Sequence, residues 1–406
     1  MVYVLDKYGK ALMPSARFGR VRRLLRNKLA VVVNREPFTI QLLYDTPGHV
    51  QDVTLGVDAG TKHVGLSATS NTKELFSSEC LLRNGIVNLL STRREIRRTR
   101  RNRLRHRAAR FDNRVKSKHK GWLAPSVENK VETHLRLIAD IYRILPVKHV
   151  VIEVAAFDTQ LLNNPEIQGE GYQRGEQLGF WNTREYVLWR DGHECQHCHG
   201  KSGDVVLNVH HIESRKTGGD SPSNLVTLCE TCHRAYHARK IELEVKRSKS
   251  LRDAAVMGIM KWELYRRAKA IYGDVRITYG YITKHTRIAN GLEKTHNVDA
   301  RCISGNPKAK PCECYKQRQT RRHNRQIHKQ NLLKGGRLKA NQAPYKVHGF
   351  RLFDKVRYNG VDCYVFGRRQ SGAFLLRKID GSLVTSSVSV KKLRFISESK
   401  RIIISK

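Results

Sequence analysis

The sequence predicts a multidomain protein of mixed α/β class, in which a small Cys/His module interrupts a larger core. Three observations support this prediction. The chain has 406 residues, which is enough for two to four domains. Residues suited to one catalytic site stand on both sides of the Cys/His segment, at the ends of strand patterns and on a helix pattern. Roughly the last 60 residues alternate apolar and polar side chains between glycine turns, which is typical of a small antiparallel β-barrel.

The remaining elements follow from hydrophobic periodicity and turn residues. The first 50 residues predict a small α/β unit, with strands at 2–6, 28–34 and 38–45 and a basic helix at 16–26. A linker at 47–51 precedes an expected hairpin over 53–70 and a third strand over 74–82. Further along, the pattern predicts helices over 127–145 and 251–273, and a buried strand from 148 that carries Glu153. The core face of the first of these helices is predicted to consist of Val131, Leu135, Ile138 and Tyr142.

The charge balance favours a polyanionic partner. The chain has 77 Lys and Arg against 36 Asp and Glu, a formal net charge of +41. Phosphates of a nucleic acid neutralise such basic groups and release condensed counterions. A generally basic surface without a partner is the alternative.

One segment concentrates this charge, since Arg93–Arg110 contains ten arginines and a single acid. Such a helix repels itself unless phosphates surround it. Because the segment lies between two regions with the patterns of folded structure, we expect a helix surrounded by nucleic acid rather than a disordered basic tail. The arginines expected to contact nucleic acid here and in a second basic segment are Arg93, Arg94, Arg97, Arg98, Arg100, Arg101, Arg103, Arg105, Arg321 and Arg322.

Four residues have the types and positions of a metal-dependent nuclease site. Asp58 and Glu153 close apolar strand patterns, while His296 and Asp299 lie one helical turn apart and can face the same way. Buried acids brought together repel one another, and divalent cations relieve that repulsion. Three carboxylates and a histidine suit two Mg²⁺ ions about 3.5–4 Å apart that hydrolyse a phosphodiester. The alternative is that each acid caps a helix or pairs with a basic residue.

The spacing of these residues indicates an insertion. About 140 residues separate Glu153 from His296, and the Cys/His module lies in this gap. It therefore separates two parts of one site, and the chain is expected to hold two catalytic centres.

The module carries a strong metal signal. Cys195-x-x-Cys198 and Cys229-x-x-Cys232 supply four thiolates for a closed tetrahedral zinc site, which is structural because no coordination position stays open. The long gap between the pairs leaves room for a hairpin pinned at its base by zinc.

Polar residues of the module are sufficient for a second nuclease site. His211 is the expected general base, and His210 and His233 are expected to hold one Mg²⁺ beside the scissile phosphate. Asn224 is expected to orient the His211 ring through its side-chain amide. His237 is either an additional ligand or a phosphate contact. The alternative for the whole module is a DNA-binding finger with incidental histidines.

The start of the chain lacks the pattern of a signal peptide, and no apolar run approaches the about 18 residues of a membrane span. Nine cysteines, four of them in Cys-x-x-Cys pairs, favour metal binding in a reducing compartment over disulfides. We therefore expect an intracellular, cytoplasmic protein.

The motifs resemble known nuclease families. "HHIE" with "SNLVTLCETCH" resembles the HNH endonuclease motif, and "GVDAGTKHVG", "VVIEVA" and "HNVDA" resemble the three motifs of RuvC-like nucleases, which have an RNase H fold. An HNH module inserted in a split RuvC-like domain, after an arginine-rich bridge helix, is similar to the IscB family of transposon-encoded OMEGA RNA-guided nucleases, relatives of the type II CRISPR effectors. "GKALMPSARFGRVRRLL" is similar to that family's PLMP domain, with Ala11 as a departure from the proline that the domain's name implies.

The resemblance implies an α/β multidomain architecture. The expected parts are an RNase H-like (RuvC) core, an inserted ββα-metal HNH domain, an arginine-rich bridge helix, a small N-terminal α/β domain and a C-terminal small β-barrel. The expected bounds are 1–50 for the PLMP-like domain, 51–84, 121–184 and 246–305 for the RuvC-like parts, 85–120 for the bridge helix, 185–245 for the HNH domain, 306–344 for a basic RNA-binding segment and 345–406 for the barrel.

The resemblance also implies an activity. A guide RNA of the ωRNA type would pair with one strand of a double-stranded DNA target, and the C-terminal barrel would read a target-adjacent motif. The HNH site would cut the RNA-paired strand and the RuvC-like site the displaced strand, with two Mg²⁺ in the latter and one in the former. The catalytic residues would be Asp58, Glu153, His296 and Asp299 in one site and His210, His211, Asn224 and His233 in the other. A monomeric ribonucleoprotein is expected, because the excess charge suits a chain wrapped by RNA.

Two alternative functions and one alternative site remain open. The alternative functions are a protein-only homing or restriction endonuclease and an RNA-binding regulator without nuclease activity. Cys302, Cys312 and Cys314 have no standard metal spacing, so a basic segment that contacts RNA is favoured there over a further metal site.

Overall fold

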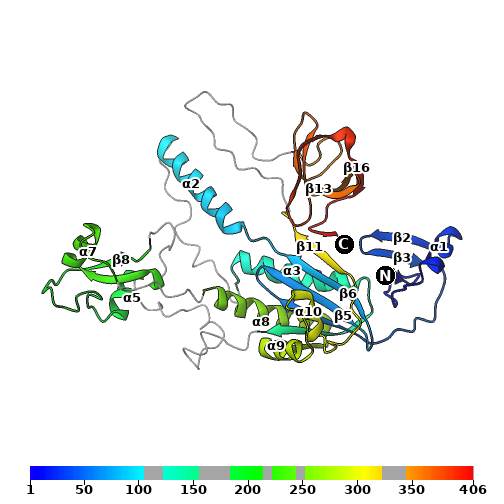
Figure 1. The fold of residues 1–406 in the computed structure, drawn as a ribbon, viewed down its shortest axis with the longest axis horizontal. Coiled ribbons are helices and arrows are strands. Elements are labelled where there is room, and N and C mark those ends of the chain that lie inside the picture. The colour runs from blue at the N-terminus through cyan, green and yellow to red at the C-terminus, as the bar shows by residue number, and fades with distance from the viewer. Residues whose placement is uncertain (105–121, 155–182, 214–221, 244–251, 322–343, 406) are drawn as a thin grey trace. The chain divides into compact units, whose positions relative to one another are not determined.

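The computed structural model describes residues 1–104, 122–154, 183–213, 222–243, 252–321 and 344–405 (Figure 1). The chain forms two compact units. The first comprises 1–117, 123–156 and 259–406, and the second comprises 118–122 and 157–258. In the sequence, residues 157–258 of the second unit therefore lie between Glu153 and His296.

A seven-stranded mixed sheet is the centre of the first unit, with strand order β10-β7-β4-β5-β6-β11-β17. β4, β5 and β6 are antiparallel neighbours, whereas β7 runs parallel to β4, β10 parallel to β7 and β11 parallel to β6. The bounds are Val53–Ala59 for β4, His63–Thr69 for β5, Glu74–Leu81 for β6, Val147–Val154 for β7, Val275–Tyr279 for β10, Cys314–Gln319 for β11 and Ile402–Ser405 for β17. The predicted hairpin, the third strand and the buried strand that carries Glu153 are confirmed.

Helix α10 lies directly against this sheet, because two glycines leave room for its backbone. A Cβ added to Gly56 of β4 would lie 2.0 Å from the carbonyl oxygen of Ala300, and one added to Gly65 of β5 would lie 1.9 Å from that of His296. No side chain fits at these distances, so both glycines bring the helix to the strands. The helices of this region are α3 (Pro125–Tyr142), α8 (Arg252–Tyr272), α9 (Gly280–Ala289) and α10 (His296–Ile303).

Helix α3 buries a stripe that differs from the predicted one. Val131 and Ile138 are buried as expected, but Leu135 and Tyr142 are only half-buried, while His134 is fully buried. The Nδ1 atom of His134 lies 2.7 Å from the carbonyl oxygen of Lys130, so this nitrogen is satisfied within the helix, whereas the buried Nε2 atom has no hydrogen-bond partner in the described part of the chain. A histidine with such a local partner can occupy a core position that its type alone does not predict.

The buried His134 is expected to make the stability of the first unit depend on pH. Burial lowers the pKa of its imidazole from 6.5 to about 4. Between these values the unfolded chain binds more protons than the folded one, so the free energy of unfolding falls as the pH is lowered through this window. We expect a loss of up to roughly 3 kcal/mol, complete near pH 4. Urea unfolding at pH 7 and pH 5 measures it, and a His134→Gln variant that keeps the wild-type pH dependence would contradict this assignment.

The N-terminal elements form the predicted α/β unit. A three-stranded sheet has the order β1-β3-β2, and α1 packs Val21 onto a cluster with Val2, Val4 and Ile40. The bounds are Tyr3–Leu5 for β1, Phe18–Arg26 for α1, Ala30–Arg35 for β2 and Phe38–Leu42 for β3. The hydroxyl of Tyr3 donates to the carbonyl oxygen of Leu75 at 3.0 Å, which ties this unit to β6.

The C-terminal residues form a five-stranded antiparallel sheet with the order β15-β14-β13-β12-β16. The bounds are Lys355–Tyr358 for β12, Val361–Arg368 for β13, Ala373–Arg377 for β14, Leu383–Ser389 for β15 and Arg394–Ser397 for β16. Val356, Val365, Phe374 and Leu376 form its buried core. The alternating strands are as predicted, whereas closure into a barrel stays a prediction. One expectation was wrong: residues Ile402–Ser405 leave this domain and pair with β11 in the large sheet, where Ile402 and Ile403 are buried.

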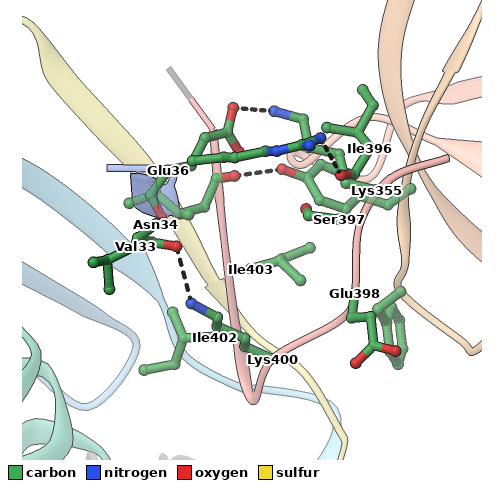
Figure 2. Close-up of a pocket in the computed structure, with 14 residues that line it drawn as sticks. Val33, Asn34, Glu36, Lys355, Ile396, Ser397, Glu398, Lys400, Ile402 and Ile403 are labelled. Carbon is green, nitrogen blue, oxygen red and sulfur yellow. Dashed lines mark hydrogen bonds and ion pairs between the residues drawn. The ribbon is translucent and has the colours of Figure 1, made fainter. Parts of the chain in front are cut away.

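A cavity of about 310 Å³ lies between the β2–β3 hairpin and the C-terminal strands (Figure 2). Lys355 lies in its wall, is almost fully buried and pairs with Glu36. Lys400 donates to the side-chain oxygen of Asn34 at 3.3 Å. No residue expected to be catalytic lines this cavity, so it belongs to the junction of the N-terminal and C-terminal elements.

An arginine-rich helix, α2, spans Ile86–Leu104. Its first residue lies one position after the expected start of the bridge helix at residue 85, and residues 105–120 of that expected helix lie outside the described residues. Arg93, Arg94 and Arg98 are exposed. None of the described helices is long and apolar enough to cross a membrane.

The second unit contains a hairpin followed by a short helix. β8 and β9 are antiparallel, and α7 begins directly after β9. The bounds are Thr183–Arg190 for α5, Leu207–His211 for β8, Pro222–Asn224 for the turn η2, Leu225–Cys229 for β9 and Glu230–His237 for α7. The predicted hairpin is confirmed, and its two strands end at His211 and Cys229.

Candidate active sites

The first unit brings Asp58 and Glu153 together on neighbouring strands. The parallel register of β4 and β7 pairs Val57 with Ile152, so the next residues, Asp58 and Glu153, lie side by side. Because side chains alternate along a strand, both point to the same face of the sheet. Gly56 shares that face and contacts α10, so the two acids lie on the side that this helix covers.

Helix α10 adds a histidine and a third acid. His296 is its first residue, and its Nδ1 atom lies 2.7 Å from Oδ2 of Asp58. This hydrogen bond to Asp58 raises the pKa of His296. Burial raises the pKa of Asp299, and the negative charges of Asp58 and Glu153 add to that effect. The three carboxylates therefore share one electrostatic environment.

Each carboxylate of this cluster contacts a cationic or histidine side chain. Nζ of Lys261, from α8, lies 2.8 Å from Oε1 of Glu153, and Nε of Arg287, from α9, lies 2.9 Å from Oδ1 of Asp299. His296 pairs with Asp58 in the same way. Neither Lys261 nor Arg287 was predicted from the sequence, because each lies in an ordinary helix pattern of a very basic chain.

The donor chemistry of the cluster fits divalent cations. Carboxylate oxygens are the ligands that Mg²⁺ prefers. Burial, with the added repulsion from Asp58 and Glu153, raises the pKa of Asp299, and a bound cation would relieve both effects. Among the described residues, however, three ligand atoms do not converge within 4.8 Å at this cluster, as they do at the two groups of the second unit. The carboxylates are turned toward their ion-pair partners instead.

Two further residues define the surroundings of His296. The His63 ring stacks on the His296 ring with centroids 5.1 Å apart and planes 6° from parallel. Glu79 of β6 accepts a hydrogen bond from the backbone N–H of His296 at 3.1 Å, which caps the start of α10. His63 is part of the quoted "GVDAGTKHVG" segment, but strand alternation alone does not place its ring on a helix that begins at residue 296.

In the second unit, four cysteines form a compact sulfur cluster. The Sγ atoms of Cys195, Cys198, Cys229 and Cys232 all lie within 4.8 Å of one another. A tetrahedral zinc with Zn–S distances of about 2.3 Å separates its sulfurs by about 3.8 Å, and the Sγ atoms of Cys198 and Cys229 are 3.8 Å apart. A hydrogen bond with Ser202 lowers the pKa of the Cys198 thiol, whereas burial raises the pKa of the Cys232 thiol, so the spacing of the four sulfurs carries the assignment. The cluster fits a structural zinc site.

Three histidines form a second cluster beside the hairpin. The ligand nitrogens of His210, His233 and His237 lie within 4.8 Å of one another, and the Nε2 atoms of His233 and His237 are 3.3 Å apart. His210 is buried, and its Nε2 has no hydrogen-bond partner in the described part of the chain. Burial lowers the pKa of His210 to about 4, so the imidazole is uncharged at neutral pH and one of its two nitrogens has a free lone pair. A buried, neutral imidazole whose Nε2 atom has no hydrogen-bond partner in the described part of the chain fits a metal ligand.

The remaining module residues are Asn224, the last residue of the η2 turn, and His211. Asn224 has 0% exposure; its Oδ1 accepts from the backbone N–H of Glu213 at 2.9 Å and its Nδ2 donates to the carbonyl of Glu213 at 3.0 Å. His211, the last residue of β8, is half-buried. These bonds fix the backbone just after His211. The contact expected from the sequence, between the Asn224 amide and the His211 ring, stays a prediction.

The arginine predictions are only partly covered by the structure. The side chains of Arg97, Arg100, Arg101 and Arg103, and all of Arg105 and Arg322, lie outside the described residues. Arg321 is half-buried, and this burial lowers its pKa. Cys302, Cys312 and Cys314 form no metal-compatible group among the described residues.

Comparison with protein families and solved structures identifies two regions. Residues 2–175 match the family described as RRXRR protein, and residues 195–239 match HNH endonuclease. A Streptococcus thermophilus Cas9 in complex with the GGAA PAM is 14% identical over 45% of this chain and 26% of its own, with a TM-score of 0.29. The type II-C Cas9 from Actinomyces naeslundii is 11% identical over 63% of this chain and 60% of its own, with a TM-score of 0.25.

Both TM-scores are low, and the chain spans about a quarter of the length of the first of these proteins, 26%. These two structures therefore add nothing to the geometry above. No curated protein matches the chain. The family matches, together with the Cys₄ and histidine clusters that fall in the second match, lead to one conclusion: the chain carries an HNH endonuclease domain at residues 195–239, preceded by an RRXRR region at residues 2–175.

Proposed function

We propose that this protein is an RNA-guided DNA endonuclease of the IscB type that makes a double-strand break. The HNH site cuts the strand paired with the guide, and the carboxylate site cuts the displaced strand. The observation that carries this proposal is the presence of two separate candidate centres: Asp58, Glu153 and Asp299 around one sheet, and the histidine cluster on the inserted unit.

The strand order supports an RNase H-like, RuvC-type core. Three antiparallel strands, β6-β5-β4, are followed by the parallel strands β7 and β10, with an acid on β4 and another on β7. A helix after a long insertion returns a further acid to the same face. This is the arrangement that the resemblance of the three sequence motifs leads one to expect.

At the carboxylate site, two bound Mg²⁺ ions would activate water and stabilise the leaving oxygen of the phosphodiester. Asp58, Glu153 and Asp299 are the residues that would hold them. His296 is held by Asp58 and is 45% exposed, so its ring is accessible from solvent. We assign it to hold and transfer a proton at this site.

At the HNH site, a metal ion held by His210, His233 and His237 would stabilise the charge on the scissile phosphate. His211 acts as general base on water, and Asn224 fixes the adjacent backbone. The sequence left His237 open, and the geometry favours a ligand. Mg²⁺ is the expected ion, but three imidazole nitrogens bind transition ions such as Mn²⁺ or Zn²⁺ more tightly.

The charge of the chain accounts for its partners. A net charge of +41 suits a long structured RNA and an RNA–DNA heteroduplex better than a short DNA site. Exposed arginines on α2 and the basic segment after Arg321 would contact phosphates, while base pairing supplies sequence specificity. The C-terminal domain would read the target-adjacent motif, and the particle would be a monomeric ribonucleoprotein with structural zinc.

RNA dependence tests this function directly. The protein is purified from its native cells, the bound RNA is sequenced, and a plasmid with the complementary target is added with Mg²⁺. We expect a linear product that disappears after ribonuclease treatment and returns with the sequenced RNA. Cleavage that persists without RNA would favour a protein-only HNH endonuclease, and binding of RNA without any cleavage would favour a regulator.

A further inference from the structure

Two cations, the buried Lys261 and the largely buried Arg287, lie within the carboxylate cluster. The side chain of Lys261 is 8% exposed and that of Arg287 is 13% exposed. In a chain with 77 Lys and Arg, most basic side chains can stay in water. A buried ammonium or guanidinium loses its hydration and is retained only where a carboxylate compensates it.

The partners of these cations are the residues that would hold metal. Lys261 contacts Glu153 at 2.8 Å, and Arg287 contacts Asp299 at 2.9 Å. The two cations come from different helices, α8 and α9, yet reach one cluster. Lys261 neutralises Glu153 and Arg287 neutralises Asp299, whereas Asp58 pairs with His296, whose charge depends on pH.

A divalent ion and these side chains compete for the same oxygens. Mg²⁺ requires near-octahedral coordination with oxygens at about 2.0–2.1 Å. A carboxylate that turns toward Mg²⁺ has to give up, or share, its hydrogen bond with Lys261 or its ion pair with Arg287. A positive charge that stays beside the ion also repels it.

We propose that Lys261 and Arg287 are counter-cations that stabilise the carboxylate cluster and compete with divalent metal for Glu153 and Asp299. They thereby set the metal concentration at which this site becomes active. The inference rests on the proposed function, because it takes Glu153 and Asp299 as metal-holding residues. It adds that the site has its own positive charge, so its fold does not depend on metal.

The test compares Lys261→Met with wild type in the protein–RNA complex. Thermal unfolding is recorded in EDTA and over a Mg²⁺ titration, and cutting of the displaced strand is measured over the same titration. We expect the variant to melt at a lower temperature in EDTA and to gain more from Mg²⁺ than wild type. We also expect it to reach half-maximal cutting at an at least tenfold lower Mg²⁺ concentration.

Matched variants separate this effect from a general loss of charge. Lys148→Met removes a lysine that pairs with Asp52 at 2.8 Å on the same sheet but is 57% exposed, and it should leave the titration unchanged. Arg287→Gln tests the second cation and should shift the Mg²⁺ titration in the same direction as Lys261→Met. It keeps the inference testable if the Lys261→Met protein folds poorly.

The outcomes distinguish the inference from the function. If wild type cuts the displaced strand but Lys261→Met and Arg287→Gln need as much Mg²⁺ as wild type or more, the two cations only position the carboxylates and the inference is wrong. If wild type shows neither stabilisation by Mg²⁺ nor a cut of that strand, the metal site itself is wrong and both proposals are overturned.

Discussion

Replacing Gly65 by alanine is expected to abolish the cut assigned to the carboxylate site. The added Cβ would lie 1.9 Å from the carbonyl oxygen of His296 and 2.4 Å from its carbon, both backbone atoms that cannot rotate away. Helix α10 must then move off β5 and carry His296 and Asp299 with it. Because a displacement of about 1 Å can reduce a rate about 10²-fold, we expect at least that loss in strand-resolved cleavage.

A matched glycine controls for the backbone effect of the substitution. Gly19 lies in α1, and an added Cβ there meets nothing within 4 Å, so Gly19→Ala should cut as wild type does. Overpacking at Gly65 should also lower the free energy of unfolding by about 1–3 kcal/mol. A Gly65→Ala protein that cuts the displaced strand at the wild-type rate would show that α10 does not supply catalytic residues.

Replacing Cys229 by serine is expected to abolish the cut assigned to the HNH site. Cys229 is 1% exposed, closes β9, and its Sγ accepts a hydrogen bond from the backbone N–H of Cys232 at the start of α7. Loss of this thiolate opens the zinc site and releases the link between the hairpin and the helix that carries His233 and His237. Structural zinc contributes folding free energy directly, so we expect protease sensitivity within residues 183–243.

The two-unit organisation makes this effect selective. The first unit has its own core, so the displaced-strand cut should persist in Cys229→Ser. Cys314→Ser is the matched control, because this half-buried cysteine of β11 belongs to no metal-compatible group among the described residues. It should retain zinc and both cuts. A Cys229→Ser protein with a full zinc content and an intact HNH cut would refute the structural role of the sulfur cluster.

Strand and helix patterns predicted most elements of the fold, because periodicity is a local property. The strands around Asp58 and Glu153, the N-terminal unit and the hairpin ending at His211 follow directly from apolar runs. The β4–β7 pairing, which places Asp58 beside Glu153, joins distant segments and has no local signature. The segment Ile402–Ser405 pairs with the large sheet because its apolar side chains can be buried at that sheet's edge. The composition of the segment does not reveal which sheet edge is available.

The candidate sites were predictable where residue type and spacing are unusual. Cys-x-x-Cys pairs and strand-end acids stand out in any chain. Lys261 and Arg287 do not, because in a chain this basic only the packing of α8 and α9 identifies the cations that reach a carboxylate. His63 and Glu79 escaped prediction for a related reason: they act on His296 across the sheet, through ring stacking and a backbone hydrogen bond.

The most direct measurement is strand-resolved cleavage of one target plasmid by Asp58→Ala and by His211→Ala. Two independent centres predict that each variant leaves a single nick, in opposite strands, and that the double variant leaves the plasmid intact. If either single variant abolishes both cuts, or both variants nick the same strand, the two-centre account is contradicted.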